Sequence, residues 1–142
     1  MSGPSIVFLT LQDVLRLHGL AIEDQGGDPR MLNPGLLEAA LAMPEQQFGG
    51  AYLHPEIPAM AAAYTFHICK NHPFADGKKR AAFAAAAAFL VLNGWTLRAS
   101  NDEVTDAIME LAAGSTTKEA LTEWFARHAA RSASCGSEGL PS

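Results

Sequence analysis

Residues 78–94 read KKRAAFAAAAAFLVLNG, and this stretch decides the fold. Its seven alanines give a helix with little side-chain bulk, while Phe83 and Leu90 fall on one face and Phe89 and Leu92 on others. A helix that is apolar all round belongs in the interior of a protein. We therefore expect a central helix here, closed by the final Asn-Gly pair, with neighbouring helices packed closely against its alanines.

Helix signals also dominate the sequence on both sides of this stretch. Thr10 precedes an apolar run at helical spacing and has Asp13 three residues on, which is typical of an N-cap. The same kinds of signal predict further helices at 11–25, 34–43, 56–71, 101–113 and 117–127. Residues 45–55 lack a helical period and contain Gly49-Gly50, so they form either a short hairpin or an exposed flap.

The sequence thus predicts an all-α protein, a compact bundle of about six helices around the central Ala-rich helix. Residues 95–97 are expected to be a short extended piece. We expect one domain over 1–131, followed by a disordered tail over 132–142, where Ser, Gly and Pro dominate.

Composition excludes several classes of protein. The chain has 142 residues, is 49% hydrophobic and 18% charged, and carries a net charge of −5. Such a chain can bury a core, and an acidic domain is a poor general nucleic-acid binder because phosphate neutralisation supplies most of that affinity. The apolar stretch 81–92 is shorter than the roughly 20 residues that span a bilayer. Cys69 and Cys135 lie far apart, so we expect a cytoplasmic protein without structural disulfides or membrane association.

The residues that carry chemistry lie at the turn into the central helix, where 72–80 read HPFADGKKR. A helix N-terminus offers free N–H groups and a positive dipole end to an anion. Three cations there are unfavourable unless something negative joins them, which suggests a bound phosphate. Asp76 can hold a Mg²⁺ that also contacts phosphate oxygens, and His72 has the ordinary pKa of a general base near neutral pH. These groups together indicate phosphoryl or nucleotidyl transfer.

The plainer interpretation of the same segment is a solvated basic face after an Asp-Gly turn.

This segment resembles the signature of the Fic/Doc family, and specifically its Doc ("death on curing") branch. The family pattern is His-x-Phe-x-Asp/Glu-Gly/Ala-Asn, followed by Gly-Arg in Fic proteins and Lys-Arg in Doc proteins. The resemblance extends to residues 33–38, 48–50, Asn71 and 93–95. It implies the Fic/Doc fold, with ATP and Mg²⁺ as cofactors.

The resemblance also implies a role for each matching residue. His72 would be the catalytic base, Asp76 the Mg²⁺ ligand and Phe74 the structural anchor of the loop. The phosphate cradle would consist of Gly77, Lys78, Lys79 and Arg80. A target segment would dock by strand addition on the flap, whose residues are Phe48, Gly49, Gly50 and Tyr52.

Doc-type members of the family are similar to kinases rather than to AMP transferases. They move the ATP γ-phosphate to a hydroxyl of the translation factor EF-Tu, which blocks translation, and a separate Phd-like antitoxin folds into a groove on the toxin. Lys79 replaces the second Gly of Fic enzymes, and Phe83 stands where AMP-transferring members keep a second Arg. The resemblance therefore implies a toxin of a toxin–antitoxin module, with AMP transfer as the alternative.

One residue departs from the family pattern, because Lys78 stands in place of the Asn. Asn offers a donor and an acceptor at fixed geometry, whereas Lys is a flexible point charge. Lys78 either still holds a phosphate or weakens the site, which would leave a catalytically degenerate binding module. The tail stretch 134–139 resembles the Fic inhibitory motif, and we interpret that match as coincidence because Gly136 disfavours a helix. His67 is expected to be a core histidine rather than a ligand.

Overall fold

The structure is a computed structural model that describes residues 6–27, 34–52, 56–71 and 78–132. The described residues form six α-helices, one short 3₁₀ turn and two small sheets. The helices are α1 (Leu11–Gln25), α2 (Pro34–Ala42), α3 (Ile57–Asn71), α4 (Lys78–Leu92), α5 (Asn101–Ala112) and α6 (Lys118–His128), with the 3₁₀ turn at Met43–Glu45. The strands are β1 (Gln47–Phe48), β2 (Ala51–Tyr52), β3 (Trp95–Leu97) and β4 (Ala129–Arg131). The predicted all-α class is confirmed.

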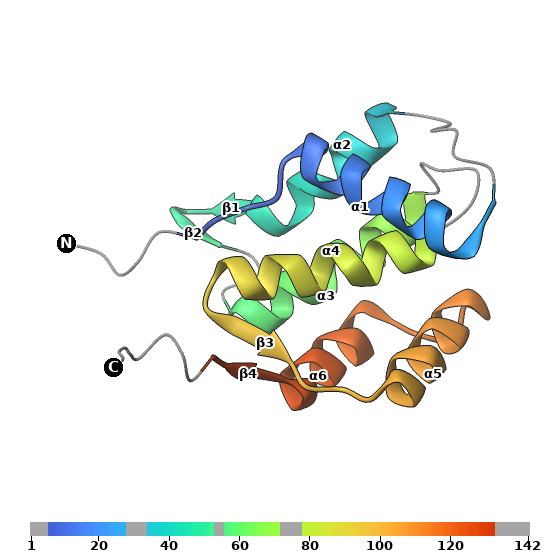
Figure 1. The fold of residues 1–142 in the computed structure, drawn as a ribbon. Helices are drawn as coiled ribbons and strands as arrows, with labels where there is room; N and C mark the ends of the chain where they lie inside the picture. Colours follow the sequence, from blue (N-terminus) through green and yellow to red (C-terminus); the bar gives the residue numbers. More distant parts are fainter. Residues whose placement is uncertain (1–5, 28–33, 53–55, 72–77, 133–142) are drawn as a thin grey trace, which may run out of the picture.

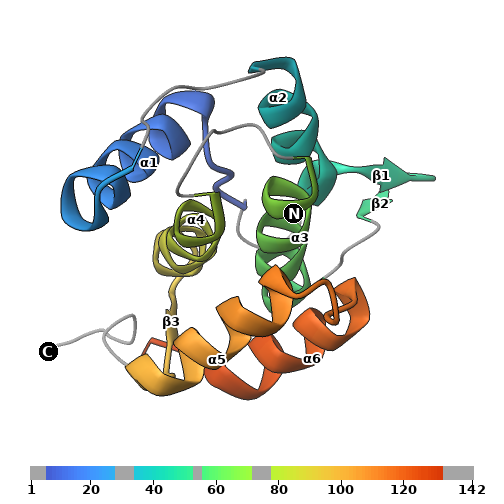
Figure 2. The same cartoon turned by 90° about the vertical axis from the view of Figure 1, so that its right-hand side faces the viewer.

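The helices form layers around a central pair (Figures 1 and 2). Helices α3 and α4 pack side by side in the middle, α1 and α2 cover them on one side, and α5 and α6 lie on the other. Helix α3 contacts both α2 and α6, while α1 packs on α4. The Ala-rich helix is therefore central, as its sequence predicts.

Alanine allows the close approach of α4 to its neighbours. Ala81, Ala82, Ala85 and Ala86 are completely buried. The last turn of α4 differs from the expectation, because Val91 and its neighbour Leu92 are 64% and 49% exposed. From Ala81 on, the helix is thus apolar on all sides, and in its last turn Val91 and Leu92 are open to solvent while Phe89 and Leu90 stay buried.

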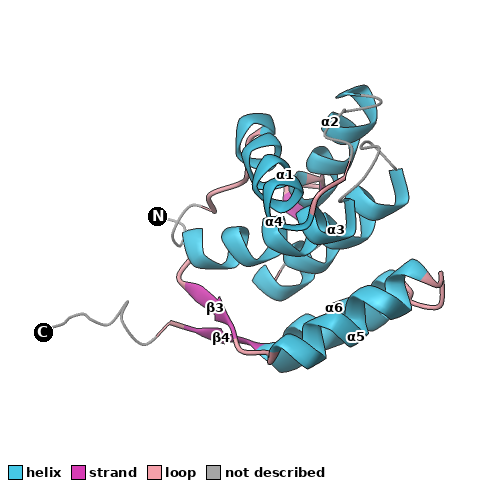
Figure 3. Cartoon of the chain, turned by 45° about the vertical axis from the view of Figure 1, so that its right-hand side comes forward, coloured by secondary structure: helices cyan, strands magenta, loops and turns pink. Residues whose placement is uncertain are grey.

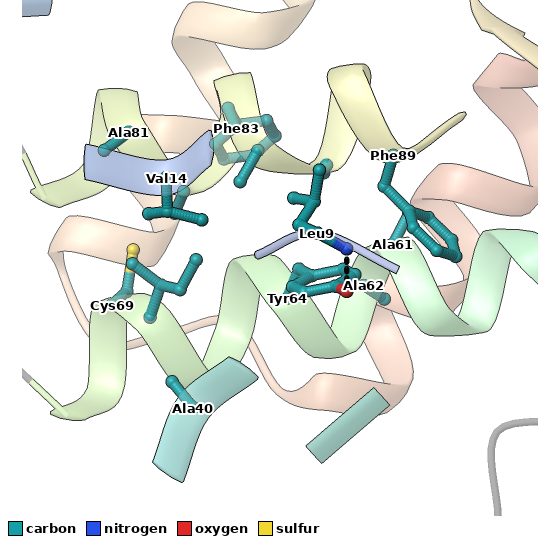
Figure 4. Close-up of a cluster of buried hydrophobic side chains, with 14 of the residues drawn as sticks. Leu9, Val14, Ala40, Ala61, Ala62, Tyr64, Cys69, Ala81, Phe83 and Phe89 are labelled. Atoms are coloured by element: carbon teal, nitrogen blue, oxygen red, sulfur yellow. Dashed lines mark hydrogen bonds between the residues drawn. The ribbon is translucent and has the colours of Figure 1, made fainter. Parts of the chain in front are cut away.

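A buried hydrogen bond joins the N-terminal segment to this core (Figure 4). The Leu9 N–H donates to the Tyr64 hydroxyl at 3.0 Å, and the Tyr64 ring packs against Phe89 with centroids 5.1 Å apart. Asn93, just after α4, binds the same segment by accepting from the Val7 N–H and donating to the Val7 carbonyl. The chain before α1 is therefore part of the core.

Polar caps begin three of the helices. Thr10 and Asp13 form the predicted capping box of α1, and Ser100 forms a second one with Glu103 at the start of α5. The cap of α6 is Thr117, whose hydroxyl accepts from the Ala120 N–H, so the helix begins at Lys118 and not at the expected residue 117. The preceding Thr116 offers the same hydroxyl, so the sequence alone left the boundary one residue open.

A second small sheet closes the C-terminal part, beside the α5–α6 pair (Figure 3). Strand β3, the predicted extended piece, pairs antiparallel with β4 in the register Trp95 with Arg131 and Leu97 with Ala129. The Ser132 N–H continues the pairing by donating to the Gly94 carbonyl at 2.8 Å. The expected tail, with its 134–139 motif, lies outside the described residues from 133 onward. Among the helices that are described, none has the length and apolar character needed to cross a membrane.

Candidate functional site

The sequence places the site between the end of α3 and the start of α4. Helix α3 ends at Asn71 and α4 begins at Lys78. Four of the predicted site residues, His72, Phe74, Asp76 and Gly77, lie outside the described residues. The structure therefore defines the two helix ends that flank the predicted site and the surfaces around them.

The first turn of α4 carries only positive side chains. Residues 78–80 read Lys-Lys-Arg, the turn holds no acidic residue, and the Arg80 side chain is exposed. The backbone of Lys78 and Lys79 is helical, while their side chains lie outside the description. Cations at a helix N-terminus oppose the dipole, whereas a bound anion would be favoured by both the dipole and the cations. This end of α4 therefore suits a phosphate chemically.

The position of Phe83 on α4 bears on the choice between transfer of the γ-phosphate and transfer of AMP. Its side chain is 5% exposed and lies against α6, edge-on to Trp124 at 5.8 Å and stacked on Phe125 at 5.9 Å between centroids. These contacts fix Phe83 as a core residue that joins α4 to α6. An apolar, covered ring cannot offer the donors with which an arginine at this position would bind a terminal phosphate.

The predicted flap is a β-hairpin. Strands β1 and β2 pair antiparallel through Gly49 and Gly50, whose φ angles of 62° and 85° fit a two-residue turn that other residues adopt with difficulty. Tyr52 is half-buried, with its ring 5.8 Å from that of Phe8, and this contact ties the hairpin to the core. The Phe48 side chain is outside the description. Among the described residues this sheet has two strands, so an outer backbone edge is open to strand addition.

An apolar groove lies between α1 and the exposed last turn of α4. Its volume is about 430 Å³, and Leu17, Ala88, Val91 and Leu92 line its apolar part. Asp13 and Arg16 of α1 also line it and add one charge of each sign. Leu20, one turn beyond Leu17, is 54% exposed. An apolar surface of this kind beside charges is typical of a docking site for an amphipathic helix.

A contact between α3 and α6 was not foreseen from the sequence. The Lys118 ammonium lies 2.9 Å from Nε2 of His67, although 51 residues separate the two along the chain. His67 is half-buried, in line with the expected core histidine, but it has a charged partner. No local sequence pattern predicts such a pair, because the contact depends on how α3 and α6 pack against each other.

Known proteins resemble this chain over most of the described helices. The Fic/DOC family model matches residues 8–90, from the segment before α1 to near the end of α4. The chain is also 38% identical over 95 residues to Toxin Doc of Mycolicibacterium smegmatis (strain ATCC 700084 / mc(2)155), a match that covers 67% of this chain and 71% of that protein. The match to the family model includes the site motif, the flap and the central helix. This chain therefore belongs to the Fic/DOC family.

Proposed function

We propose that the protein is a Doc-type toxin that transfers the γ-phosphate of ATP to a hydroxyl of a protein, in the cytoplasm. The similarity to Toxin Doc and the basic first turn of α4 support a toxin that binds phosphate. The observation that carries the choice of phosphate over AMP transfer is the burial of Phe83 against Trp124 and Phe125. The AMP-transferring members of the family keep an arginine at this position, and here a buried aromatic ring takes its place.

The proposed reaction needs a base, a phosphate cradle and a positioned target. His72 takes the proton of the attacking hydroxyl. The hydroxyl oxygen then bonds to the γ-phosphorus, and the bond to the bridging oxygen breaks to release ADP. Gly77, Lys79 and Arg80 hold the phosphates by backbone N–H groups and charge at the start of α4.

The donor set fits Mg²⁺ as the companion of ATP. Mg²⁺ binds through one or two carboxylates and completes its shell with phosphate oxygens and waters, and Asp76 is the carboxylate in the motif. When bound, the ion neutralises charge on the phosphates. Lys78, which stands where the family has Asn, serves in our proposal as a third cation of the cradle.

We further propose that the target is an EF-Tu-like translation factor and that it docks on the β1–β2 hairpin. An extended target segment pairs there with an open strand edge, which would place its hydroxyl toward the site. The Tyr52–Phe8 contact supports this role, because a hairpin fixed to the core is a firmer template than one that moves.

The deciding experiment is a transfer assay with target lysate, Mg²⁺ and ATP labelled in either the α- or the γ-phosphate. Label on protein from γ-labelled ATP alone, lost in His72→Ala, supports the kinase. Label from α-labelled ATP makes the protein an AMP transferase despite Phe83. No label from either, with a helical circular dichroism spectrum, indicates the binding module with a degenerate site.

The groove between α1 and α4 supports a second part of the proposal, a Phd-like antitoxin as partner. We propose that an amphipathic helix of the antitoxin covers Leu20, Val91 and Leu92. Val91→Asp should abolish neutralisation of the toxin by a co-expressed antitoxin. Met109 on α5 is also 64% exposed and lies outside the groove lining, so Met109→Asp is the matched control. Equal neutralisation of both variants would place the antitoxin elsewhere.

A further inference from the structure

The contact between Lys118 and His67 fixes the chemical state of the histidine. An ammonium group has three donors and no acceptor, so at 2.9 Å Lys118 Nζ must donate to His67 Nε2. Nε2 then carries no hydrogen, and the imidazole is neutral with its proton on Nδ1. A lysine in this geometry therefore selects one tautomer of His67.

The two residues occupy positions that matter for the predicted site. His67 lies one helical turn before Asn71, the last residue of α3, and the motif begins directly after it at His72. Lys118 is the first residue of α6, after the cap Thr117. A cation in the first turn is opposed by the helix dipole, so α6 itself gains no stability from this charge.

Helix α6 contacts both of the helices that flank the motif. Lys118 in its first turn reaches His67 on α3, and Trp124 and Phe125 pack on Phe83 of α4. The same helix thus holds the end of α3 through a hydrogen bond and the start of α4 through an aromatic cluster. In both contacts the residues contributed by α6 lie beyond residue 90, where the family match ends, so a helix outside the matched segment supports the two helices within it.

We propose that Lys118 is a positioning residue for phosphate transfer, an inference that rests on the function proposed above. By donating to His67 it fixes the last turn of α3 against α6, while the aromatic cluster fixes α4 against the same helix. The separation of the two helix ends is thereby set. Catalysis depends on such geometry, since a misplacement of about 1 Å can lower a rate by about a hundredfold.

The test compares Lys118→Met with Lys118→Arg in the full chain. Met keeps the apolar stem and removes the donor, whereas Arg restores a donor. We expect Lys118→Met to lower kcat about tenfold with little change in KM for ATP, and Lys118→Arg to recover most of the loss. Lys70→Met is the matched control, because Lys70 is an exposed cation on α3 that lies over the Phe66 ring at 5.7 Å. Its kcat should equal that of the wild type.

A spectroscopic measurement without ATP tests the contact itself. The nitrogen chemical shifts of the His67 ring, assigned with His67→Gln, should show the Nδ1–H tautomer in the wild type. Lys118→Met should move them toward the Nε2–H tautomer. Wild-type shifts of the Nε2–H form would overturn the inference at its first step.

The outcomes also separate this inference from the function on which it rests. A wild-type protein that transfers phosphate, with Lys118→Met equally active, would overturn the positioning role alone. Loss of activity that Lys118→Arg does not recover, or an equal loss in Lys70→Met, would likewise count against it. A wild-type protein that transfers no phosphate would overturn the proposed function and, with it, any role of Lys118 in that reaction.

Discussion

At position 78 the chain has lysine where its family has asparagine. A single substitution tests whether this lysine supports or weakens phosphate transfer. Lysine adds charge to the start of α4, but its flexible stem orients a phosphate less well than an amide with fixed donor and acceptor. We predict that Lys78→Asn raises kcat/KM for ATP about tenfold, equivalent to about 1.4 kcal/mol in the transition state. Steady-state phosphate transfer measures it. A loss of activity in Lys78→Asn would mean that the lysine charge is needed.

Tyr64 offers a prediction about stability. Its hydroxyl accepts from the Leu9 N–H inside the core, so Tyr64→Phe leaves a buried donor without its acceptor. We expect the free energy of unfolding to fall by about 1–3 kcal/mol in urea titrations at neutral pH. Tyr52→Phe, at a half-buried ring, should change it by no more than about 0.5 kcal/mol. Equal effects of the two variants would contradict a special role for the Leu9 contact.

The same phenol gives the protein a pH dependence in alkali. Burial raises the pKa of Tyr64 above its ordinary value, while the unfolded chain ionises this group near pH 10. Below about pH 10 the contribution to stability is fully present, and it is lost as pH rises further because the unfolded state releases the proton more readily. The free energy of unfolding should therefore fall more steeply with pH in the wild type than in Tyr64→Phe. Parallel curves would show that Tyr64 does not carry the effect.

Among the elements, α1 depends on its cap. The Thr10 hydroxyl accepts from the Asp13 N–H at 3.1 Å, and the Asp13 carboxylate accepts from the Thr10 N–H at 2.9 Å. Thr10→Ala removes the first bond and should lower the free energy of unfolding by about 1 kcal/mol. Thr105→Ala, at an exposed position inside α5, should keep or slightly raise it because alanine is the better helix former. Urea midpoints of the two variants decide the matter.

The Asp13 carboxylate makes the stability contributed by this cap depend on pH in the acid range. The Thr10 backbone N–H, which donates to it, lowers the pKa of Asp13 below its ordinary value. A lowered pKa in the folded state means that the contribution is present above the unfolded pKa of about 3.9 and is lost as pH falls through the folded value. Asp13→Asn should therefore flatten the acid dependence of stability. An unchanged acid limb would show that other carboxyl groups account for it.

Local signals explain why most elements could be predicted from the sequence. Thr10 and Asp13 predict α1, and the alanine run predicts α4. Gly49-Gly50 left a hairpin and an exposed flap open, and the structure shows the hairpin. Strand β4 could not be predicted, because Ala129–Arg131 has no alternating pattern and its partner β3 lies more than thirty residues earlier. The start of α6 was displaced by one residue, since Thr116 and Thr117 are equivalent as caps until the packing chooses between them.

At the scale of the whole molecule, the candidate site could be predicted only in its local part. The motif over 72–80 is contiguous, so local patterns are enough to predict phosphate chemistry there, and this stays a prediction because 72–77 lie outside the described residues. The support around it is assembled from distant segments: Lys118 on His67, the Phe83 cluster, and the groove between α1 and α4. Such contacts depend on helix packing, which a single sequence read by local patterns does not specify.

The aromatic cluster between α4 and α6 leads to a last prediction about the whole chain. Phe125 is completely buried and packs on Phe83 and Trp124, so the segment matched by the family model depends on a helix beyond it. Phe125→Ala should lower the free energy of unfolding by about 3–5 kcal/mol, whereas Met109→Ala on the exposed side of α5 should change it by about 0.5 kcal/mol or less.

A truncated chain ending at Arg98 tests the same dependence directly. Removing α5, α6 and β4 uncovers Phe83 and leaves His67 without the Lys118 donor, so the remaining helices should lose cooperative unfolding and bind a hydrophobic dye. Thermal unfolding followed by circular dichroism measures the first property, and dye fluorescence the second. A sharp transition near the wild-type midpoint would show that residues 1–98 fold alone. In that case α6 could not set the positions of α3 and α4, and the site geometry would have to come from the matched segment itself.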